Sequence, residues 1–331
     1  MKGKKWIVSL LAAGALIAGG YMASAADMEL SQEGGVTQGM AFFSQSGDAL
    51  YQDIMTNYRG KDFGPSRAMR QTVHVEDHEL KGFRWFKFTS LHPVPAGATK
   101  KILYIHGGAW VMPEGAQQLD YARWLADNSG AEVYFPEYPL APEHDAEMSM
   151  NWVMDLYKEM LKDTPASEIS VMGDSAGGAM ALSLAMMARD AGLPQPNSLV
   201  LYSPGVDIRI WRTPEEVDYN NKIAGAGLFA VVSRSQPDIL RWWQGKLPET
   251  DDRVNPLFGN LKGLAPMTIF TGSTENVAIM KLAAKAAEER VPISYYEKLN
   301  AVHTWVVFPG EDNSRERALV LDILRHPGEK N

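Results

Sequence analysis

From residue 72 onward, short apolar runs alternate with stretches of helical periodicity. The segment 72–90 alternates apolar and polar positions and is typical of two paired strands. Six further apolar runs predict strands at 101–105, 131–138, 168–172, 198–203, 266–271 and 292–298. Amphipathic stretches predict helices at 114–128, 146–162, 176–191, 275–290 and 312–325. Short apolar strands separated by such helices indicate a mainly parallel sheet buried on both faces, so the predicted fold class is α/β.

Two segments fall outside this alternation. Residues 26–71 are polar and interrupted by glycine, with one predicted helix at about 48–58, and we interpret them as an N-terminal arm that contributes to a cap. Residues 205–255 form an insertion in the α/β domain, which we place at 72–331. A segment inserted after a strand of an α/β sheet tends to lie over the strand ends, where ligands bind. The insertion is therefore predicted to form a cap over the substrate site. The alternative is that it has a purely structural role.

The run ISVMGDSAGGAM at 169–180 places one serine between a predicted strand and a predicted helix. Within it, Gly173 to Gly177 match the pattern G-x-S-x-G in the strand–turn–helix context where that pattern positions a nucleophile. Such a tight turn strains the serine backbone, and small neighbours are needed for the helix to pass the strand. Ser175 is therefore the candidate nucleophile, held at the carboxyl end of the sheet. A glycine-rich turn with a capping serine is the alternative.

A serine hydroxyl needs a general base to act as a nucleophile at neutral pH, and the base needs an orienting carboxylate. In this turn geometry the three groups follow each other along the chain as serine, acid and histidine. Only His303 and His326 follow Ser175. His303 lies in a loop just after the last predicted strand, whereas His326 lies in the terminal tail, so His303 is the predicted base.

The acid has two candidates. Glu275 follows the apolar run 266–271 by four residues, which places its carboxylate at the same edge of the sheet as the nucleophile. Asp207 lies in the loop after the predicted strand 198–203 and could reach the imidazole from there. We predict Glu275 as the acid, and Asp207 stays open as the alternative.

A tetrahedral intermediate of acyl transfer carries a negative oxygen, at which backbone N–H groups must point. The loop HGGA at 106–109 ends a predicted strand with glycines that leave the approach open, and the N–H of Ala176 directly follows the nucleophile. These groups predict an oxyanion hole. His106 is interpreted as a residue that fixes the loop.

Five motifs occur in a specific order: HGGAW at 106–110, YPLAPEH at 138–144, GDSAGG at 173–178, NPLFGNLKGLAP at 255–266 and VHTW at 302–305. Together they resemble the hormone-sensitive-lipase-like branch of the α/β-hydrolase fold, a group of microbial esterases, over about residues 75–325.

The resemblance implies carboxylic-ester hydrolysis through a triad of Ser175, Glu275 and His303. It also implies oxyanion donors at Gly107, Gly108 and Ala176, and a cap built from the N-terminal arm and part of the insertion. Two departures from the family pattern stand out. Ala109 occupies a position where a third glycine is frequent, and the acid is Glu where Asp is more usual.

The predicted function is therefore a serine carboxylesterase that hydrolyses short- to medium-chain acyl esters through an acyl-enzyme intermediate, with a small-molecule ester as its partner. A polysaccharide acetyl esterase, an acyltransferase or a peptidase would use the same triad, since acyl-enzyme chemistry does not fix the acceptor. A non-catalytic ligand-binding relative is a further alternative. Trp242 and Trp243 in the insertion would either line an acyl pocket or pack the cap.

No cofactor and no metal is predicted. His74 and His78 have the spacing of a helical zinc pair, but their segment reads as a strand. Four residues of a strand span roughly 13 Å, which is too far for one ion bonded at about 2 Å.

The first 25 residues read as an export signal, with a basic start, an apolar middle and the small-residue cleavage site ASA at 23–25. We expect a secreted or otherwise extracytoplasmic protein, attached to a membrane only if this segment stays uncleaved. Removing the segment takes away three lysines and no acid, so the net charge moves from −8 to −11. Such an acidic protein has no electrostatic basis for binding nucleic acid. The chain has no Cys, which excludes disulfides and thiolate chemistry.

Overall fold

The protein is described from a computed structural model, which covers residues 42–92, 94–95, 97–207, 228–273, 275, 277–299, 301, 303–308 and 313–328. The expected export signal at 1–25 lies outside the described residues, as do the start of the predicted arm and residues 208–227 of the predicted cap.

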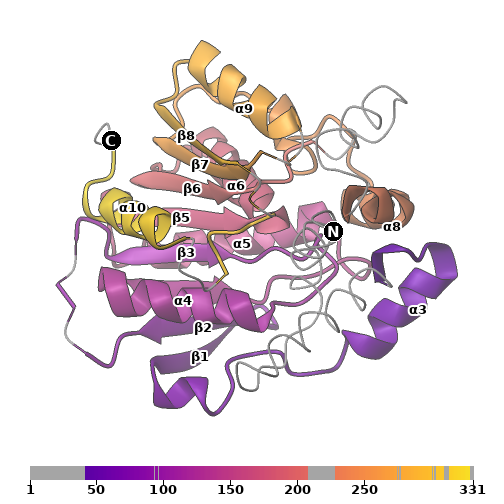
Figure 1. Cartoon of the computed structure of the whole chain (residues 1–331), viewed down its shortest axis with the longest axis horizontal. Helices are drawn as coiled ribbons and strands as arrows, with labels where there is room; N and C mark the ends of the chain where they lie inside the picture. Colours follow the sequence, from indigo (N-terminus) through magenta and orange to yellow (C-terminus); the bar gives the residue numbers. More distant parts are fainter. Residues whose placement is uncertain are drawn as a thin grey trace, which may run out of the picture.

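Within these residues, eight strands form one sheet in the order β1-β2-β4-β3-β5-β6-β7-β8 (Figure 1). The strands are β1 (His74–Leu80), β2 (Phe83–Thr89), β3 (Lys101–Ile105), β4 (Glu132–Pro136), β5 (Ile169–Asp174), β6 (Ser198–Tyr202), β7 (Met267–Gly272) and β8 (Ile293–Lys298). Strand β2 pairs antiparallel with β1 and with β4, and all pairs from β4 to β8 are parallel. The predicted mainly parallel sheet is confirmed.

Helices cover both faces of the sheet. The helices of eight or more residues are α3 (Gly47–Asn57), α4 (Ala116–Ser129), α5 (Ala146–Met160), α6 (Ala176–Asp190), α8 (Leu228–Gln244), α9 (Val277–Glu288) and α10 (Ser314–Arg325). Short 3-10 turns lie at Met69–Gln71, Ala166–Glu168 and Pro256–Phe258. One core forms against α4 and α10, and a second, larger core forms against α5, α6 and α9.

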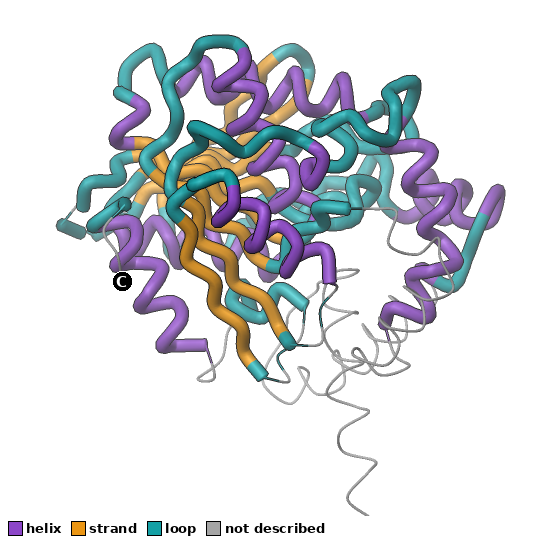
Figure 2. The backbone as a smooth tube through the Cα atoms, turned by 90° about the horizontal axis from the view of Figure 1, so that it is seen from above, coloured by secondary structure: helices purple, strands orange, loops and turns teal. Residues whose placement is uncertain are grey.

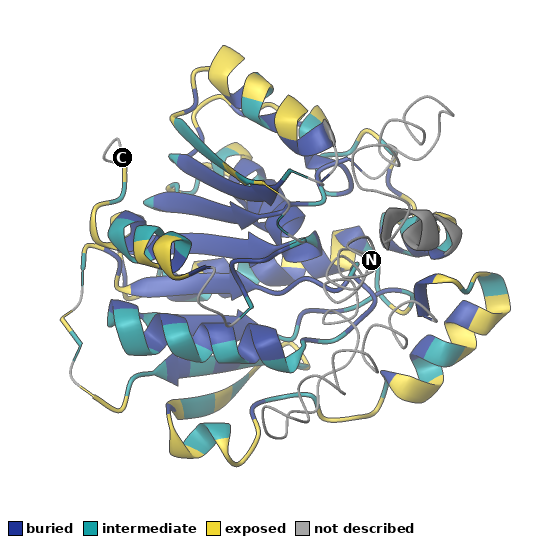
Figure 3. Cartoon of the chain, viewed as in Figure 1, coloured by how far each residue is buried: buried dark blue, intermediate teal, exposed yellow. Residues whose placement is uncertain are grey.

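The two cores follow from the period of two along each strand. In β6, Leu199 and Leu201 enter the larger core, whereas Val200 and Tyr202 enter the core under α4 and α10. The central strands are buried on both sides as a result (Figure 3). This double burial is the reason that they read as continuous apolar runs in the sequence.

Single residues at the helix ends determine where some of the helices begin and end. Asp145 caps α5, because its side chain accepts a hydrogen bond from the N–H of Met148 at 3.1 Å. Gly130 ends α4 in a left-handed conformation at φ 71°. The predicted strands and helices are present with their ends moved by a few residues.

The arm and the insertion meet in space. Helices α3 and α8 lie side by side at one end of the molecule in both views (Figures 1 and 2). The N–H of Gly47, at the start of α3, donates to Asp238 of α8 at 2.6 Å. Among the described helices, none combines the length and the apolar character that a membrane span requires.

Candidate active site

Ser175 stands at the turn between β5 and α6 with a backbone φ of 53° and ψ of −118°. Residues other than glycine rarely adopt this region, so the conformation is strained. The glycines on either side permit the turn. A Cβ on Gly173 would overlap the carbonyl oxygen of Gly177, and a Cβ on Gly177 would overlap the carbonyl oxygen of Ile105 in β3. The N–H of Ser175 donates to the carbonyl of Tyr202 at 2.8 Å, which ties the turn to β6.

The three predicted triad side chains are in hydrogen-bond contact. His303 Nε2 lies 2.9 Å from Ser175 Oγ. His303 Nδ1 lies 3.0 Å from one carboxylate oxygen of Glu275 and 3.2 Å from the other. A carboxylate on Nδ1 keeps the proton there, which leaves Nε2 free to accept the serine proton.

The two acid candidates are placed differently. Glu275 follows β7, is 8% exposed, and has its N–H bonded to the carbonyl of Gly272 at 3.1 Å. Asp207 is buried after β6 and makes contacts of its own. Since both oxygens of Glu275 lie within 3.2 Å of His303 Nδ1, the geometry favours Glu275 as the orienting acid.

The charge around His303 suits a proton acceptor. Burial of the imidazole lowers its pKa, but the charge and the hydrogen bond of Glu275, with a smaller contribution from the charge of Asp174, outweigh burial and raise the pKa above its ordinary value. The site therefore stabilises the imidazolium that forms when His303 takes a proton.

The loop after β3 carries the predicted oxyanion donors. Gly108 (φ 125°) and Ala109 (φ 52°) both lie in left-handed backbone regions, which explains why glycine is frequent at the position of Ala109. Ala176 is the first residue of α6, where backbone N–H groups lack intrahelical partners. The N–H of Gly107 donates to Asp174 Oδ1 at 3.1 Å, however. This bond gives the N–H of Gly107 a partner within the protein, which argues against Gly107 as an oxyanion donor, and the roles of Gly108 and Ala176 stay predictions.

Asp174 is a residue of the site that sequence reasoning missed. It is buried directly before the nucleophile and accepts hydrogen bonds from Tyr104 Oη at 2.9 Å, Gln118 Nε2 at 2.8 Å and the N–H of Gly107. Gln118 Oε1 in turn accepts from the N–H of Gly115 at 2.7 Å. Burial raises the pKa of Asp174, against the effect of these donors. Its place inside the G-x-S-x-G motif was the available signal, but its partners come from distant segments.

Among the described residues, the insertion contacts the candidate site at Gly205, whose N–H donates to the carbonyl of Ser175 at 3.0 Å, and Trp243 lies against the neighbouring Trp110. A Cβ on Gly205 would lie 3.7 Å from the ring of Trp110 and 3.8 Å from the carbonyl oxygen of Ser175, so Trp110 borders the nucleophile turn. Trp243 of α8 stacks on Trp110 with ring centroids 5.1 Å apart. Trp242 instead faces the ring of Tyr51 in α3 at 6.1 Å. The two adjacent tryptophans thus have different neighbours: Trp243 packs toward the site and Trp242 toward the arm.

Among the described residues, no group of three or more His, Cys, Asp or Glu side chains is arranged to hold a metal ion. His74 and His78 both lie on β1, as the sequence predicts.

Comparison with known proteins identifies the family of this chain. A family model described as alpha/beta hydrolase fold matches residues 102–307, a range that contains Ser175, Glu275 and His303. The chain belongs to this α/β-hydrolase family.

Two proteins of Mycobacterium tuberculosis are similar in sequence to this α/β-hydrolase. A protein named triacylglycerol lipase is 29% identical over 241 residues, which cover 72% of this chain and 48% of that protein. A protein named Esterase LipI is 36% identical over 249 residues, which cover 68% of this chain and 73% of that protein. The α/β-hydrolase thus spans about half the length of the first relative and about three quarters of the second.

Solved structures agree on the fold. A hormone-sensitive lipase from a metagenome library has a TM-score of 0.69 at 24% identity and covers 80% of this chain and 88% of its own. An esterase from the bacterial hormone-sensitive lipase family has a TM-score of 0.69 at 20% identity and covers 92% of this chain and 99% of its own. The predicted α/β-hydrolase fold and the resemblance to the hormone-sensitive-lipase-like branch are confirmed.

Proposed function

We propose that the protein is an exported serine carboxylesterase that hydrolyses small-molecule esters of short- to medium-chain acids. The observation that carries the proposal is the continuous hydrogen-bonded chain from Ser175 through His303 to Glu275, which begins at a strained serine between a strand and a helix. That arrangement is the one that activates a hydroxyl for attack on a carbonyl carbon. Relatives named as esterases support the same reaction class.

In the proposed reaction, Ser175 Oγ bonds to the ester carbonyl carbon while its proton passes to His303 Nε2. The carbonyl oxygen becomes an oxyanion, which accepts hydrogen bonds from the N–H groups of Gly108 and Ala176. Collapse of this intermediate breaks the bond to the alcohol oxygen, which leaves with the proton from His303. Water then attacks the acyl-enzyme, with His303 again as base, and releases the acid and free Ser175. Glu275 holds the imidazole and stabilises its protonated form in both steps.

Two tryptophans beside the nucleophile support an ester with an apolar acyl group. The stacked rings of Trp110 and Trp243 are buried next to the turn and give an apolar wall. Apolar walls of this kind suit the apolar acyl part of an ester.

The direct test uses p-nitrophenyl acetate and butyrate. We expect a burst of p-nitrophenol equal to the enzyme concentration if deacylation is the slower step, and steady turnover in either case. The Ser175→Ala variant should lose about 10⁴- to 10⁶-fold in kcat. A protein that neither turns over these esters nor reacts with a serine-directed phosphonate would contradict the proposal and favour a non-catalytic ligand-binding role.

A further inference from the structure

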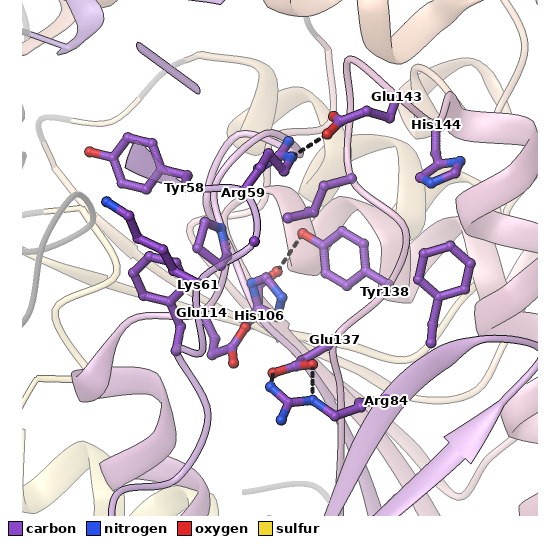
Figure 4. A pocket seen from close by; sticks show the side chains of 15 residues that line it. Tyr58, Arg59, Lys61, Arg84, His106, Glu114, Glu137, Tyr138, Glu143 and His144 are labelled. Carbon is purple, nitrogen blue, oxygen red and sulfur yellow. Dashed lines mark hydrogen bonds and ion pairs between the residues drawn. The ribbon is translucent and has the colours of Figure 1, made fainter. Parts of the chain in front are cut away.

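One arginine of the arm bonds to two loops at the carboxyl edge of the sheet. Arg59 lies on the wall of a cavity between the arm and these loops, and its Nε donates to a carboxylate oxygen of Glu143 at 2.7 Å (Figure 4). Its Nη2 donates to the carbonyl oxygen of Ala141, also in the loop after β4, at 2.6 Å. Its Nη1 donates to the carbonyl oxygen of Val111, in the loop after β3, at 3.0 Å. All three nitrogens of the guanidinium are therefore bonded, each to a different residue.

Val111 belongs to a tight turn that starts at Gly108, a predicted oxyanion donor. The N–H groups of Val111 and Met112 both donate to the carbonyl of Gly108, at 3.1 and 2.9 Å. The carbonyl of Val111 and the N–H of Met112 belong to one planar peptide group. The bond from Arg59 to that carbonyl therefore also fixes the direction of the N–H that holds Gly108.

This turn lies against the candidate nucleophile and has a strained backbone. A Cβ on Gly107 would lie 2.9 Å from the Cβ of Ser175. The next three residues, Gly108, Ala109 and Trp110, have φ of 125°, 52° and 60°. Backbone of this kind persists only where its surroundings hold it. The conformation that presents the N–H of Gly108 thus depends on bonds from outside the turn.

Bonds from three directions hold the loop after β3. Tyr138 Oη donates to the carbonyl of His106 at 3.0 Å, at the start of the loop (Figure 4). The N–H of Ala141 donates to the carbonyl of Trp110 at 2.9 Å. Arg59 adds a bond from the arm, and a hydrogen bond from a charged donor is about twice as strong as one between neutral groups. The arm is therefore connected to the turn by a strong bond.

We propose that Arg59 is a positioning residue for the proposed ester hydrolysis, because it holds the turn 108–112 in the conformation in which the N–H of Gly108 meets the oxyanion. The inference rests on the proposed function. Arg59 acts through the peptide group between Val111 and Met112 rather than on the ester. Its loss weakens the bonds to the oxyanion, which exists only after attack, and leaves binding of the uncharged ester nearly unchanged.

The test compares two arginines of the arm that have similar partners. Arg59→Met removes the three donors at similar side-chain length, and Arg70→Met is the matched control. Arg70 binds both oxygens of Asp77, at 2.6 and 2.8 Å. It also donates to the carbonyl oxygens of Pro65 and Val75, at 3.1 and 3.4 Å, which lie outside the loop after β3. A general loosening of the arm should therefore affect both variants, and a loss of oxyanion positioning only Arg59→Met.

Steady-state kinetics on p-nitrophenyl butyrate measure the catalytic effect, with active sites counted by a serine-directed phosphonate. Arg59→Met should lower kcat by about 10- to 100-fold, less than the loss of about 10²- to 10³-fold when an oxyanion donor is removed outright. KM should stay within about 3-fold of the parent value, because acylation and deacylation both pass through an oxyanion. Arg70→Met should keep the kcat and KM of the parent.

A trifluoromethyl ketone provides a readout that a purely structural role would not change. Its adduct with Ser175 carries the oxyanion, so its inhibition constant in Arg59→Met should rise by the same factor by which kcat/KM falls. An unchanged kcat in Arg59→Met, equal losses in Arg59→Met and Arg70→Met, or an unchanged inhibition constant would overturn the proposal.

Hydrogen exchange tests the structural step without any turnover. The amides of Val111 and Met112 should exchange at least about 10-fold faster in Arg59→Met than in the parent and in Arg70→Met, because the turn opens more often. Equal exchange in all three proteins would overturn the proposal. A parent protein that is inert toward esters would contradict the proposed function instead, and the exchange then still decides whether Arg59 holds the turn.

A second variant covers the case in which Arg59→Met does not fold in a thermal melt. Arg59→Lys keeps the charge, but one ammonium group cannot match the three acceptors that the planar guanidinium reaches. It should show the same changes in kcat, inhibition constant and exchange, each smaller than expected for Arg59→Met. Parent values for all three in folded Arg59→Lys would overturn the proposal.

Discussion

Strained single residues mark the candidate active site. Ser175, Ala109 and Trp110 all have positive φ, at 53°, 52° and 60°, although none is glycine. Each such residue costs on the order of 1–3 kcal/mol and persists only where its surroundings hold it. Ser175 is held by its bond to the carbonyl of Tyr202, and the loop at Gly108 by bonds from the N–H groups of Val111 and Met112 to its carbonyl. These bonds fix the positions of the hydroxyl and of the N–H groups that would stabilise an oxyanion.

The choice between the two acids can be decided by single substitutions. Glu275→Gln removes the charge that raises the pKa of His303 and should lower kcat by about 10³- to 10⁴-fold. Asp207→Asn is the matched control, and we expect its kcat to stay close to that of the parent. The kcat of both variants is measured on p-nitrophenyl butyrate, using only protein that unfolds cooperatively in a thermal melt and is therefore folded. A larger loss of kcat in Asp207→Asn than in Glu275→Gln would instead identify Asp207 as the acid.

The pH profile of the parent and of Glu275→Gln adds a second readout. His303 must be neutral to accept the serine proton, so kcat/KM falls as the pH drops through the pKa of His303. Because Glu275 raises that pKa, removing its charge should move the acidic limb of the profile to lower pH. An acidic limb at the same pH in the parent and in Glu275→Gln would show that Glu275 does not change the pKa of His303.

At the scale of elements, the turn between β5 and α6 depends on the close approach of α6 to β3. Gly177→Ala places a methyl group against the carbonyl oxygen of Ile105, which belongs to backbone and cannot yield. We expect a loss of about 3 kcal/mol or more in the free energy of unfolding. Gly205→Ala is the control, since its Cβ meets atoms only at 3.7 Å and beyond and the change in stability should stay within about 1 kcal/mol. Urea denaturation measures both, and equal stabilities would contradict the packing argument.

Most elements could be predicted from local pattern. Strands β5, β6 and β7 are buried throughout, so their sequences are apolar over their whole length. The helices carry an apolar side toward one of two cores, and this gives them a period that is visible without the structure. Element ends were less certain because caps such as Asp145 and Gly130 are single residues.

At the scale of the whole molecule, residues distant in sequence build the region over the sheet. Helix α3 of the arm bonds to α8 of the insertion through Gly47 and Asp238, and Arg59 of the arm bonds to Glu143 in the loop after β4. Trp243 of α8 then meets Trp110 of the loop after β3. The arm and the insertion thus both contact the loops that surround the candidate nucleophile.

The N-terminal segment leads to a prediction about the intact protein. Expressed in a bacterial host with an export pathway, the chain should be cleaved after Ala25, so that the mature protein begins at Ala26. The reason is the small-residue site that follows the apolar run. Intact mass and N-terminal sequencing of the extracytoplasmic fraction measure this, with a chain lacking residues 1–25 as the control that should stay in the cytoplasm. Full-length protein in the membrane fraction would instead indicate an uncleaved anchor.

The sequence by itself determined the α/β class, the order of elements, and the candidate nucleophile and base. These follow from period, from glycine spacing and from chain order, all of which are local properties of the chain. Only the tertiary structure decided which carboxylate contacts His303, because that contact joins residues 28 positions apart while the contact with Ser175 spans 128. The same holds for the bond from the N–H of Gly107 to Asp174 Oδ1 and for the stacking of Trp110 on Trp243. Both depend on side chains that only folding brings together, and no periodicity encodes them.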